Sequence, residues 1–275
     1  MSQTLALLLS ACRRAVAAMA CGLMLAPALV LGGPGPDAAA GKLQVGMDYV
    51  VPPFVGGAKV RTPETLDTAL AEALASKLAL SVQAVAAAPS GKDAVLGTDK
   101  PRVVLAIVPD GQPVPGATVA IPTGYAAAPM AIMRTDTDIK SWEQLQGRTV
   151  CVSEGGRHVG TMAARYGAKE MVFRAPADGL LALRIGECDA AVHDDVMLKA
   201  LLKLPEWKKF SASLTEKARA PLVFLAAADD TEMVETLGHL TKEWKSRRHL
   251  AELTKSRVHD IAFEVYLDQV VADCH

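Results

Sequence analysis

Two short apolar strands are predicted within residues 141–195, and each leads directly into polar or glycine-rich residues. Thr149–Val152 is followed by Ser-Glu-Gly-Gly-Arg-His, and Asp189–Val192 is followed by His-Asp-Asp. A helix is predicted after each of these polar segments. Ligands of open α/β sheets bind beyond the carboxyl ends of the strands. The sequence therefore predicts a binding site where these two strand ends meet.

Predicted strands and helices alternate along the remainder of the chain. This order is typical of βαβ units and predicts an α/β fold with mostly parallel sheets. The first helix is expected to begin at Thr62-Pro63-Glu64, because Thr can cap a helix and Pro suits its first position. The other predicted strands span 43–48, 81–86, 103–108, 117–121 and 222–227, and the other helices 158–166, 177–185, 194–204, 231–246 and 248–255.

The first 40 residues are predicted to be a secretory signal peptide. Arg13-Arg14 precede an uncharged apolar run over residues 15–31, and Ala38-Ala39-Ala40 offer a small-residue cleavage site. A retained membrane anchor, a twin-arginine signal at Arg13-Arg14 and a lipoprotein at Cys21 are the alternatives. We expect cleavage near Ala40, which places the mature protein in the periplasm.

The charge balance argues against nucleic-acid binding. Without Arg13, Arg14 and Asp37, the totals of 29 basic and 30 acidic residues become 27 and 29, a formal charge of −2. The chain carries no basic stripe of the kind that binds phosphate backbones. Only 4% of its residues are aromatic, fewer than a carbohydrate binder would use for stacking. We expect a soluble, monomeric mature protein with a small-molecule ligand.

No catalytic or cofactor motif is recognisable in the sequence. It contains no G-x-S-x-G, H-E-x-x-H, phosphate loop or dinucleotide fingerprint. His158, His193, Asp194 and Asp195 are residue types that bind metals, but their spacing is not diagnostic of a metal site. We therefore expect no enzyme activity, no cofactor and no metal. Because a few proteins of the fold considered below are dehydratases, catalysis stays an alternative.

Three cysteines follow the predicted signal peptide. Cys151 lies at the start of one predicted strand and Cys188 immediately precedes another, so the two can form a disulfide if these strands are neighbours. Export to an oxidising compartment favours that bond, and two buried free thiols are the alternative. Cys274 is left over, either free or paired between molecules.

The order of these segments resembles the periplasmic solute-binding proteins of ABC transporters, of the amino-acid-binding, family 3-like type. Leu-Gln-Val-Gly-Met-Asp…Pro-Pro-Phe at 43–54 is similar to that family's opening strand and ligand loop. Residues 141–150 are similar to its segment entering the second lobe. Residues 186–195 match its Gly-x-x-Asp-Ala-x-x-x-Asp pattern, whose last aspartate, here Asp194, commonly receives the ligand's ammonium group. Some members also have a disulfide at the positions of Cys151 and Cys188.

The resemblance implies a type II periplasmic-binding-protein fold. One lobe would contain residues 41–127 plus 226–275 and the other residues 128–225, with two strands crossing near 127–133 and 222–227. A ligand in the cleft would drive hinge closure. Asp48 is a cleft residue or a loop-capping acid, and Tyr125 a site aromatic or hinge packing. The implied ligand-binding residues are Asp48, Tyr49, Phe54, Tyr125, Gly155, Gly156, Arg157, His158 and Asp194.

Several positions depart from the family pattern. A Thr-x-x-Arg carboxylate clamp is expected after residues 103–108, but residues 109–115 contain no arginine. Val51 stands where a stacking aromatic is usual. Arg157 lies in the glycine-rich turn before a predicted helix, and two roles are open for it: it docks an anionic group of the ligand, or it only pairs with Glu154 or Asp194. The prediction is a binding protein for a small polar or anionic, amino-acid-like ligand of an ABC importer. The alternative is a degenerate cleft whose surface docks a periplasmic partner such as a quinoprotein dehydrogenase.

Overall fold

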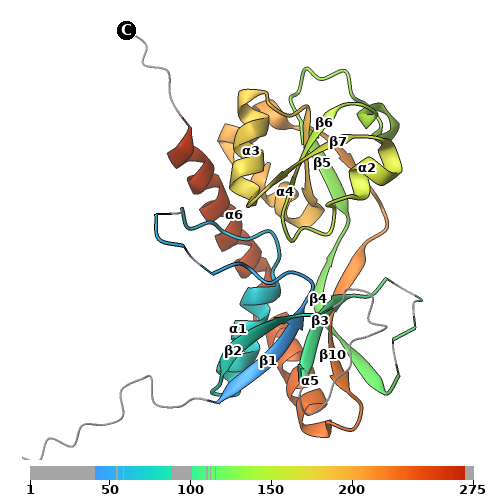
Figure 1. Ribbon diagram of the computed structural model, residues 1–275, viewed down its shortest axis with the longest axis vertical. Coiled ribbons are helices and arrows are strands. Elements are labelled where there is room, and N and C mark those ends of the chain that lie inside the picture. Colours follow the sequence, from blue (N-terminus) through green and yellow to red (C-terminus); the bar gives the residue numbers. More distant parts are fainter. Residues whose placement is uncertain are drawn as a thin grey trace, which may run out of the picture. The chain divides into compact units, whose positions relative to one another are not determined.

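The computed structural model describes residues 41–53, 55–57, 59–87, 101–109, 111, 113–114 and 116–269 (Figure 1). The predicted signal peptide, Phe54 and Cys274 lie outside these ranges. None of the helices within them combines the length and apolar character needed to cross a membrane.

The first of two five-stranded sheets has the order β2-β1-β3-β10-β4. Its strands β1 and β2 pair in parallel, as do β1 and β3, whereas β10 runs antiparallel to both of its neighbours. These strands are β1 (Lys42–Met47), β2 (Ser81–Ala86), β3 (Val103–Ile107), β4 (Thr118–Ala127) and β10 (Ala220–Ala227).

The second sheet has the order β7-β6-β8-β5-β9. Here β6 pairs in parallel with β7 and β8, and β5 runs antiparallel to β8 and β9. The sequence did not predict β9, a short strand. The strands are β5 (Pro129–Met133), β6 (Thr149–Ser153), β7 (Lys169–Phe173), β8 (Ala190–Asp194) and β9 (Ala212–Thr215).

The expectation of mostly parallel sheets is wrong, because each sheet contains two parallel and two antiparallel pairs. The reason lies in the two places where the chain crosses between the sheets. Strand β4 continues through Ala128 into β5, and residues 216–219 connect β9 to β10 (Figure 1). The strands next to these crossings are β4, β5, β9 and β10, and each of them runs antiparallel to its neighbours in the sheet. The strands that helices connect within one sheet run parallel to each other.

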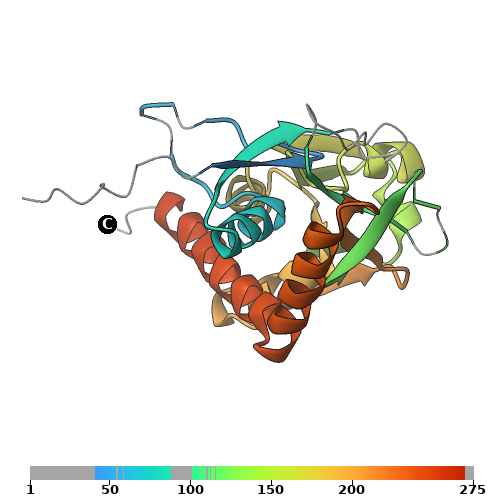
Figure 2. The same cartoon turned by 90° about the horizontal axis from the view of Figure 1, so that it is seen from below.

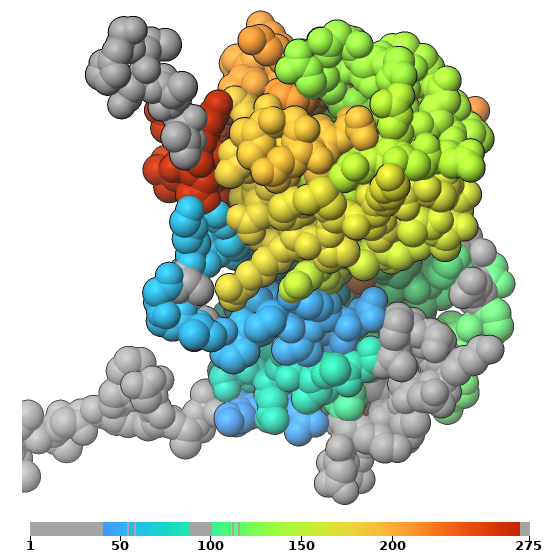
Figure 3. Space-filling model, turned by 45° about the horizontal axis from the view of Figure 1, so that its top comes forward, coloured from blue at the N-terminus to red at the C-terminus, as the bar shows by residue number. Residues whose placement is uncertain are grey.

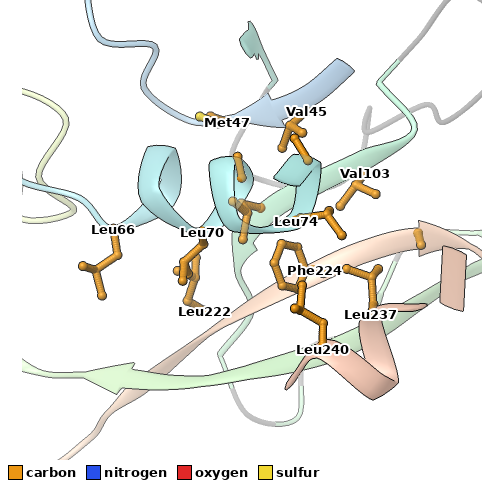
Figure 4. Close-up of a cluster of buried hydrophobic side chains, with 14 of the residues drawn as sticks. Val45, Met47, Leu66, Leu70, Leu74, Val103, Leu222, Phe224, Leu237 and Leu240 are labelled. Atoms are coloured by element: carbon orange, nitrogen blue, oxygen red, sulfur yellow. The ribbon is translucent and has the colours of Figure 1, made fainter. Parts of the chain in front are cut away.

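The core of the first sheet lies between its strands and the helices α1 (Asp67–Lys77) and α5 (Thr231–Ser246). Leu74 of α1 and Leu237 and Leu240 of α5 lie around Phe224, and Leu70 lies beside Leu222 (Figure 4). Leu70 and Leu74 are four residues apart and Leu237 and Leu240 three, close to one helical turn, so each helix turns one apolar stripe to the sheet.

The second sheet is covered on both faces. On one face lie α2 (Thr161–Tyr166) and the short 3₁₀ helix η1 (Trp142–Leu145). The other face carries α3 (Pro176–Ile185), α4 (Asp195–Leu201) and the 3₁₀ helix η2 (Pro205–Phe210). The C-terminal helix α6 (His249–Asp268) adds its buried residues Val258, Ile261 and Val265 to this second cluster.

Helix α6 differs from the sequence prediction in length. The helix predicted over residues 248–255 continues to Asp268, and it joins α5 at a sharp corner (Figure 2). Arg248 makes that corner with a left-handed backbone, φ 55°. Because α6 contacts α5 and also packs on α3 and α4, it connects the helices of the two sheets.

The first helix begins at Asp67 and not at Thr62, so that part of the prediction is wrong. The amide and hydroxyl groups of Thr62 both donate to Glu264 Oε1 of α6, over 2.9 and 2.7 Å. Arg257 of α6 donates to the carbonyl of Thr65 over 3.0 Å and to that of Pro63. These tertiary contacts hold residues 62–66 in an irregular conformation that local capping preference does not anticipate.

The Cys151–Cys188 disulfide expected from the sequence is present. Cys151 lies in β6, and Cys188 precedes β8, its parallel neighbour, which places the two Cα atoms 5.9 Å apart. Both residues are buried in the cluster between the second sheet and α3. The bond therefore fixes the two strands whose carboxyl ends carry the candidate site.

Reducing this disulfide should lower the free energy of unfolding by about 3–4 kcal/mol, because it releases a loop of 37 residues in the unfolded chain. The measurement is urea unfolding with and without dithiothreitol. The double variant Cys151→Ala/Cys188→Ala is the control and should not respond to the reductant. A wild-type midpoint that does not move with reductant would contradict the prediction.

Candidate functional site

Three of the predicted site residues converge on the carboxylate of a fourth, Asp194 at the end of β8. The hydroxyl group of Tyr125, on β4 of the first sheet, donates to Asp194 Oδ2 over 2.7 Å. His158 Nε2 lies 2.9 Å and Arg157 Nε 3.2 Å from Oδ1. Arg157 and His158 come from the turn between β6 and α2, so both strand ends and the other sheet contribute to this cluster.

The Arg157–Asp194 contact is one of the two pairings considered from the sequence for a purely structural Arg157. Arg157 also donates to the carbonyl of Ala220 over 3.3 Å, and its guanidinium carbon lies 5.9 Å from the centre of the Tyr125 ring. Burial opposes ionisation of Asp194, but the hydrogen bond from His158 and the charge of Arg157 hold the pKa of its carboxyl below the ordinary value. Burial and the same carboxylate raise the pKa of Tyr125.

The glycine-rich turn allows the two sheets to approach closely. Gly155 has φ +72°, and a Cβ atom there would lie 2.4 Å from the ring of Tyr49. At Gly156 a Cβ atom would lie 3.0 Å from Glu64 Cγ. The Tyr49 hydroxyl donates to Glu154 Oε2 over 3.1 Å. Side chains at these two positions would therefore collide with Tyr49 and Glu64. The described part of the blue segment lies directly against the yellow part of the chain in Figure 3.

Glu64 and His193 form a second contact between the two sheets. His193 Nδ1 on β8 lies 2.8 Å from Glu64 Oε2, and the His193 side chain is fully buried. Its Nε2 has no hydrogen-bond partner among the described residues. From the sequence, Glu64 is expected in the first turn of a helix, and His193 is a candidate only as a metal ligand. No local pattern could pair them, because 129 residues separate them.

A small cavity of about 90 Å³ lies beside the Asp194 cluster. Both sheets contribute to it, so it is a cleft between them. Arg157 is the one basic side chain among its described lining residues, which also include four acids. The lining residues are Asp48, Glu64, Thr65, Leu66, Asp67, Leu105, Ala106, Ile107, Tyr125, Gly155, Arg157, Asp194 and Leu222.

Asp67 is the cleft residue that sequence reasoning missed. It is only 7% exposed and its carboxylate forms no hydrogen bond or ion pair within the described part of the chain, although its oxygen atoms are not sealed from the cavity that they line. Burial, together with the nearby charges of Asp48 and Asp194, raises its pKa to about 6 against the opposing charge of Arg157. Partial burial likewise raises the pKa of Asp48. The apolar pattern of α1 does not indicate that Asp67 faces the cleft.

The remaining predicted residues are accounted for as follows. Asp48, Tyr125, Gly155, Arg157 and Asp194 line the cavity. Tyr49, Gly156 and His158 do not line it but contact residues that do: Tyr49 lies against Gly155, Gly156 against Glu64, and His158 bonds to Asp194. Phe54 lies outside the described residues. Within the described ranges no three His, Cys, Asp or Glu side chains are arranged to hold a metal ion.

Solved structures with similar folds include several solute-binding proteins. An ancestral cationic amino-acid solute-binding protein has 23% identity and a TM-score of 0.50, with 79% of this chain and 96% of that one covered. A mutant of ArgBP from T. maritima has 21% identity, a TM-score of 0.47 and coverages of 80% and 95%. The substrate-binding protein of an amino-acid ABC transporter has 19% identity, a TM-score of 0.46 and coverages of 83% and 100%.

No protein-family model and no curated protein matches the chain. The similarity to the ancestral protein shows the fold, so the two-lobed solute-binding-protein architecture expected from the sequence is confirmed.

The substitution Asp67→Asn should stabilise the protein relative to wild type at neutral pH. Because the folded state keeps the Asp67 proton up to pH about 6 and the unfolded state releases it near 3.8, wild-type stability falls as pH rises between these values. The free-energy advantage of Asp67→Asn should therefore grow from pH 4 to pH 7, reaching roughly 1–3 kcal/mol.

Urea unfolding of both proteins across this pH range measures the effect. Asp229→Asn, at an exposed aspartate outside the cleft, is the matched control and should show no such trend. A pH-independent difference between Asp67→Asn and wild type would contradict the assignment of a raised pKa to Asp67.

Proposed function

We propose that this protein is an exported, periplasmic solute-binding protein that captures a small amino-acid-like ligand between its two lobes for an ABC importer. The lobes are residues 41–127 plus 226–275 and residues 128–225. The observation that carries the proposal is the buried, unpartnered carboxylate of Asp67 in the cleft. A buried carboxylate without a partner is costly, and a ligand cation at that position would relieve the cost.

The charge of the cleft supports a cationic ligand over a purely anionic one. Asp48 and Asp67 carry no ion pair within the described chain, whereas Arg157 already contacts Asp194. A zwitterionic ligand can separate that internal pair, with its ammonium group at Asp194 and its carboxylate at Arg157. A second cationic group on the ligand would then reach Asp48 and Asp67. This arrangement substitutes for the absent Thr-x-x-Arg clamp.

Ligand entry requires the lobes to separate, because a cavity of about 90 Å³ is smaller than the usual 300–1,000 Å³ of small-molecule sites. Several polar contacts oppose this separation, in addition to the Tyr125–Asp194 hydrogen bond between the two sheets. They include Tyr49–Glu154, Glu64–His193 and Arg61–Asp178. The two crossing segments, at Ala128 and at residues 216–219, are the natural hinge.

A thermal-shift screen tests the proposal, with L-lysine, L-arginine, L-leucine and succinate as probes. A ligand at 100 times its dissociation constant should add about 2.7 kcal/mol to the free energy of unfolding. We expect the shift for L-lysine or L-arginine and none for succinate. The absence of a shift with any of the four compounds would overturn the proposal.

Two variants then separate the parts of the site. Asp194→Ala should abolish the shift with every ligand. Asp67→Asn should weaken binding of the cationic ligand by about tenfold or more, the loss of one charge-assisted hydrogen bond. Asp229→Asn should bind as wild type does. Unchanged affinity in Asp67→Asn would remove Asp67 from the ligand site.

A further inference from the structure

A second and larger cavity lies on the hinge side of the molecule. It has a volume of about 770 Å³, within the range typical of small-molecule sites. The end of β4, helix α4, Arg219 of the second crossing and helix α6 line it. Among the described lining residues it shares only Tyr125 with the cleft, so it is a separate site. We call it the hinge-side pocket.

Apolar side chains from two helices form one wall of the hinge-side pocket. Val196, Ala200 and Leu204 come from α4 and the residues after it, and Leu250 and Val258 come from α6. Apart from the buried Val258, these side chains are half-buried, because α4 and α6 do not close over them. The wall can therefore take up the apolar body of a ligand and gain free energy from the surface it buries.

Basic side chains surround this wall. Lys199, Lys203, Arg219 and Lys255 face two acids, Asp195 and Glu252, which leaves a formal charge of +2 with His259 neutral.

The charge of Asp195 is already satisfied. Its Oδ1 accepts the amide of Ala128 over 3.0 Å, and its Oδ2 lies 2.7 Å from Lys199 Nζ and 3.2 Å from Arg219 Nη1. Lys203 and Lys255, by contrast, form no ion pair within the part of the chain that the structure describes. Glu252 also forms no ion pair there, so these three residues contribute a net charge of +1, and the group of Asp195, Lys199 and Arg219 contributes another +1.

We propose that the hinge-side pocket binds an amphipathic organic anion, a molecule with a carboxylate or sulfonate head and an apolar body. The head would lie between Lys203 and Lys255, and the body against Val196, Ala200 and Leu250. A cation would meet the net positive charge, and a purely polar anion would leave the apolar wall exposed to water. A ligand with both an anionic head and an apolar body complements the lysines and the apolar wall together.

Binding of the fluorescent anion 1-anilinonaphthalene-8-sulfonate to the folded protein tests the proposal. We expect one site per chain, from which decanoate displaces the dye. The double variant Lys203→Glu/Lys255→Glu should raise the dissociation constant by about tenfold or more. Lys208→Glu/Lys209→Glu makes the same charge change at exposed lysines outside the pocket and should leave it unaltered.

A third variant tests the apolar wall without changing charge. Ala251 is exposed on α6 and lines the pocket, so Ala251→Trp should fill it, weaken dye binding and leave the melting temperature near that of wild type. Equal affinity in wild type, the Lys203/Lys255 variant and Ala251→Trp would overturn the proposal. An equal loss in the Lys208/Lys209 control would overturn it too, because binding would then follow net charge alone.

Discussion

The arrangement of the two sheets depends on the contacts made by the carboxylate of Asp194. It ends β8 of the second sheet and accepts the Tyr125 hydroxyl from β4 of the first. Arg157 and His158 hold its other oxygen and balance its charge in a buried position. Because a buried carboxylate is costly unless it is paired, these three donors make the approach of the sheets favourable at this point. The disulfide between Cys151 and Cys188 holds β6, which precedes Arg157 and His158, beside β8, which ends at Asp194.

Paired and unpaired carboxylates in the same cleft have opposite consequences. Asp194 is ionised and neutralised by protein groups, whereas Asp67 is buried without a partner and its pKa is raised to about 6. The first stabilises the contact between the sheets. The second destabilises the protein at neutral pH, and under the proposed function a ligand cation would offset that cost on binding. This difference favours ligand capture over a purely structural role for the cleft.

Two adjacent aspartates connect the cleft with the hinge. Asp194 faces the cleft, and Asp195 binds the amide of Ala128, where the chain crosses between the sheets. Arg219 lies in the second crossing segment, residues 216–219. It contacts Asp195 and donates to the carbonyl of Ala126 over 2.6 Å, and so links this segment to the first crossing at Ala128. A movement of the hinge must therefore displace groups on both sides of β8. Cleft and hinge-side pocket meet at Tyr125, the residue they share.

The sequence by itself determined the α/β class and most of the strands, because local periodicity encodes them. It also predicted that Cys151 and Cys188 can pair if their strands are neighbours, and a short motif made Asp194 a candidate site residue. The tertiary structure decided that these strands are neighbours. Tertiary structure decided the mixed strand directions, the start of α1 at Asp67 and the Glu64–His193 contact. It also decided that Asp67 is buried without a partner. These features depend on residues more than 60 positions apart, and no local pattern specifies which distant side chain or strand will lie opposite.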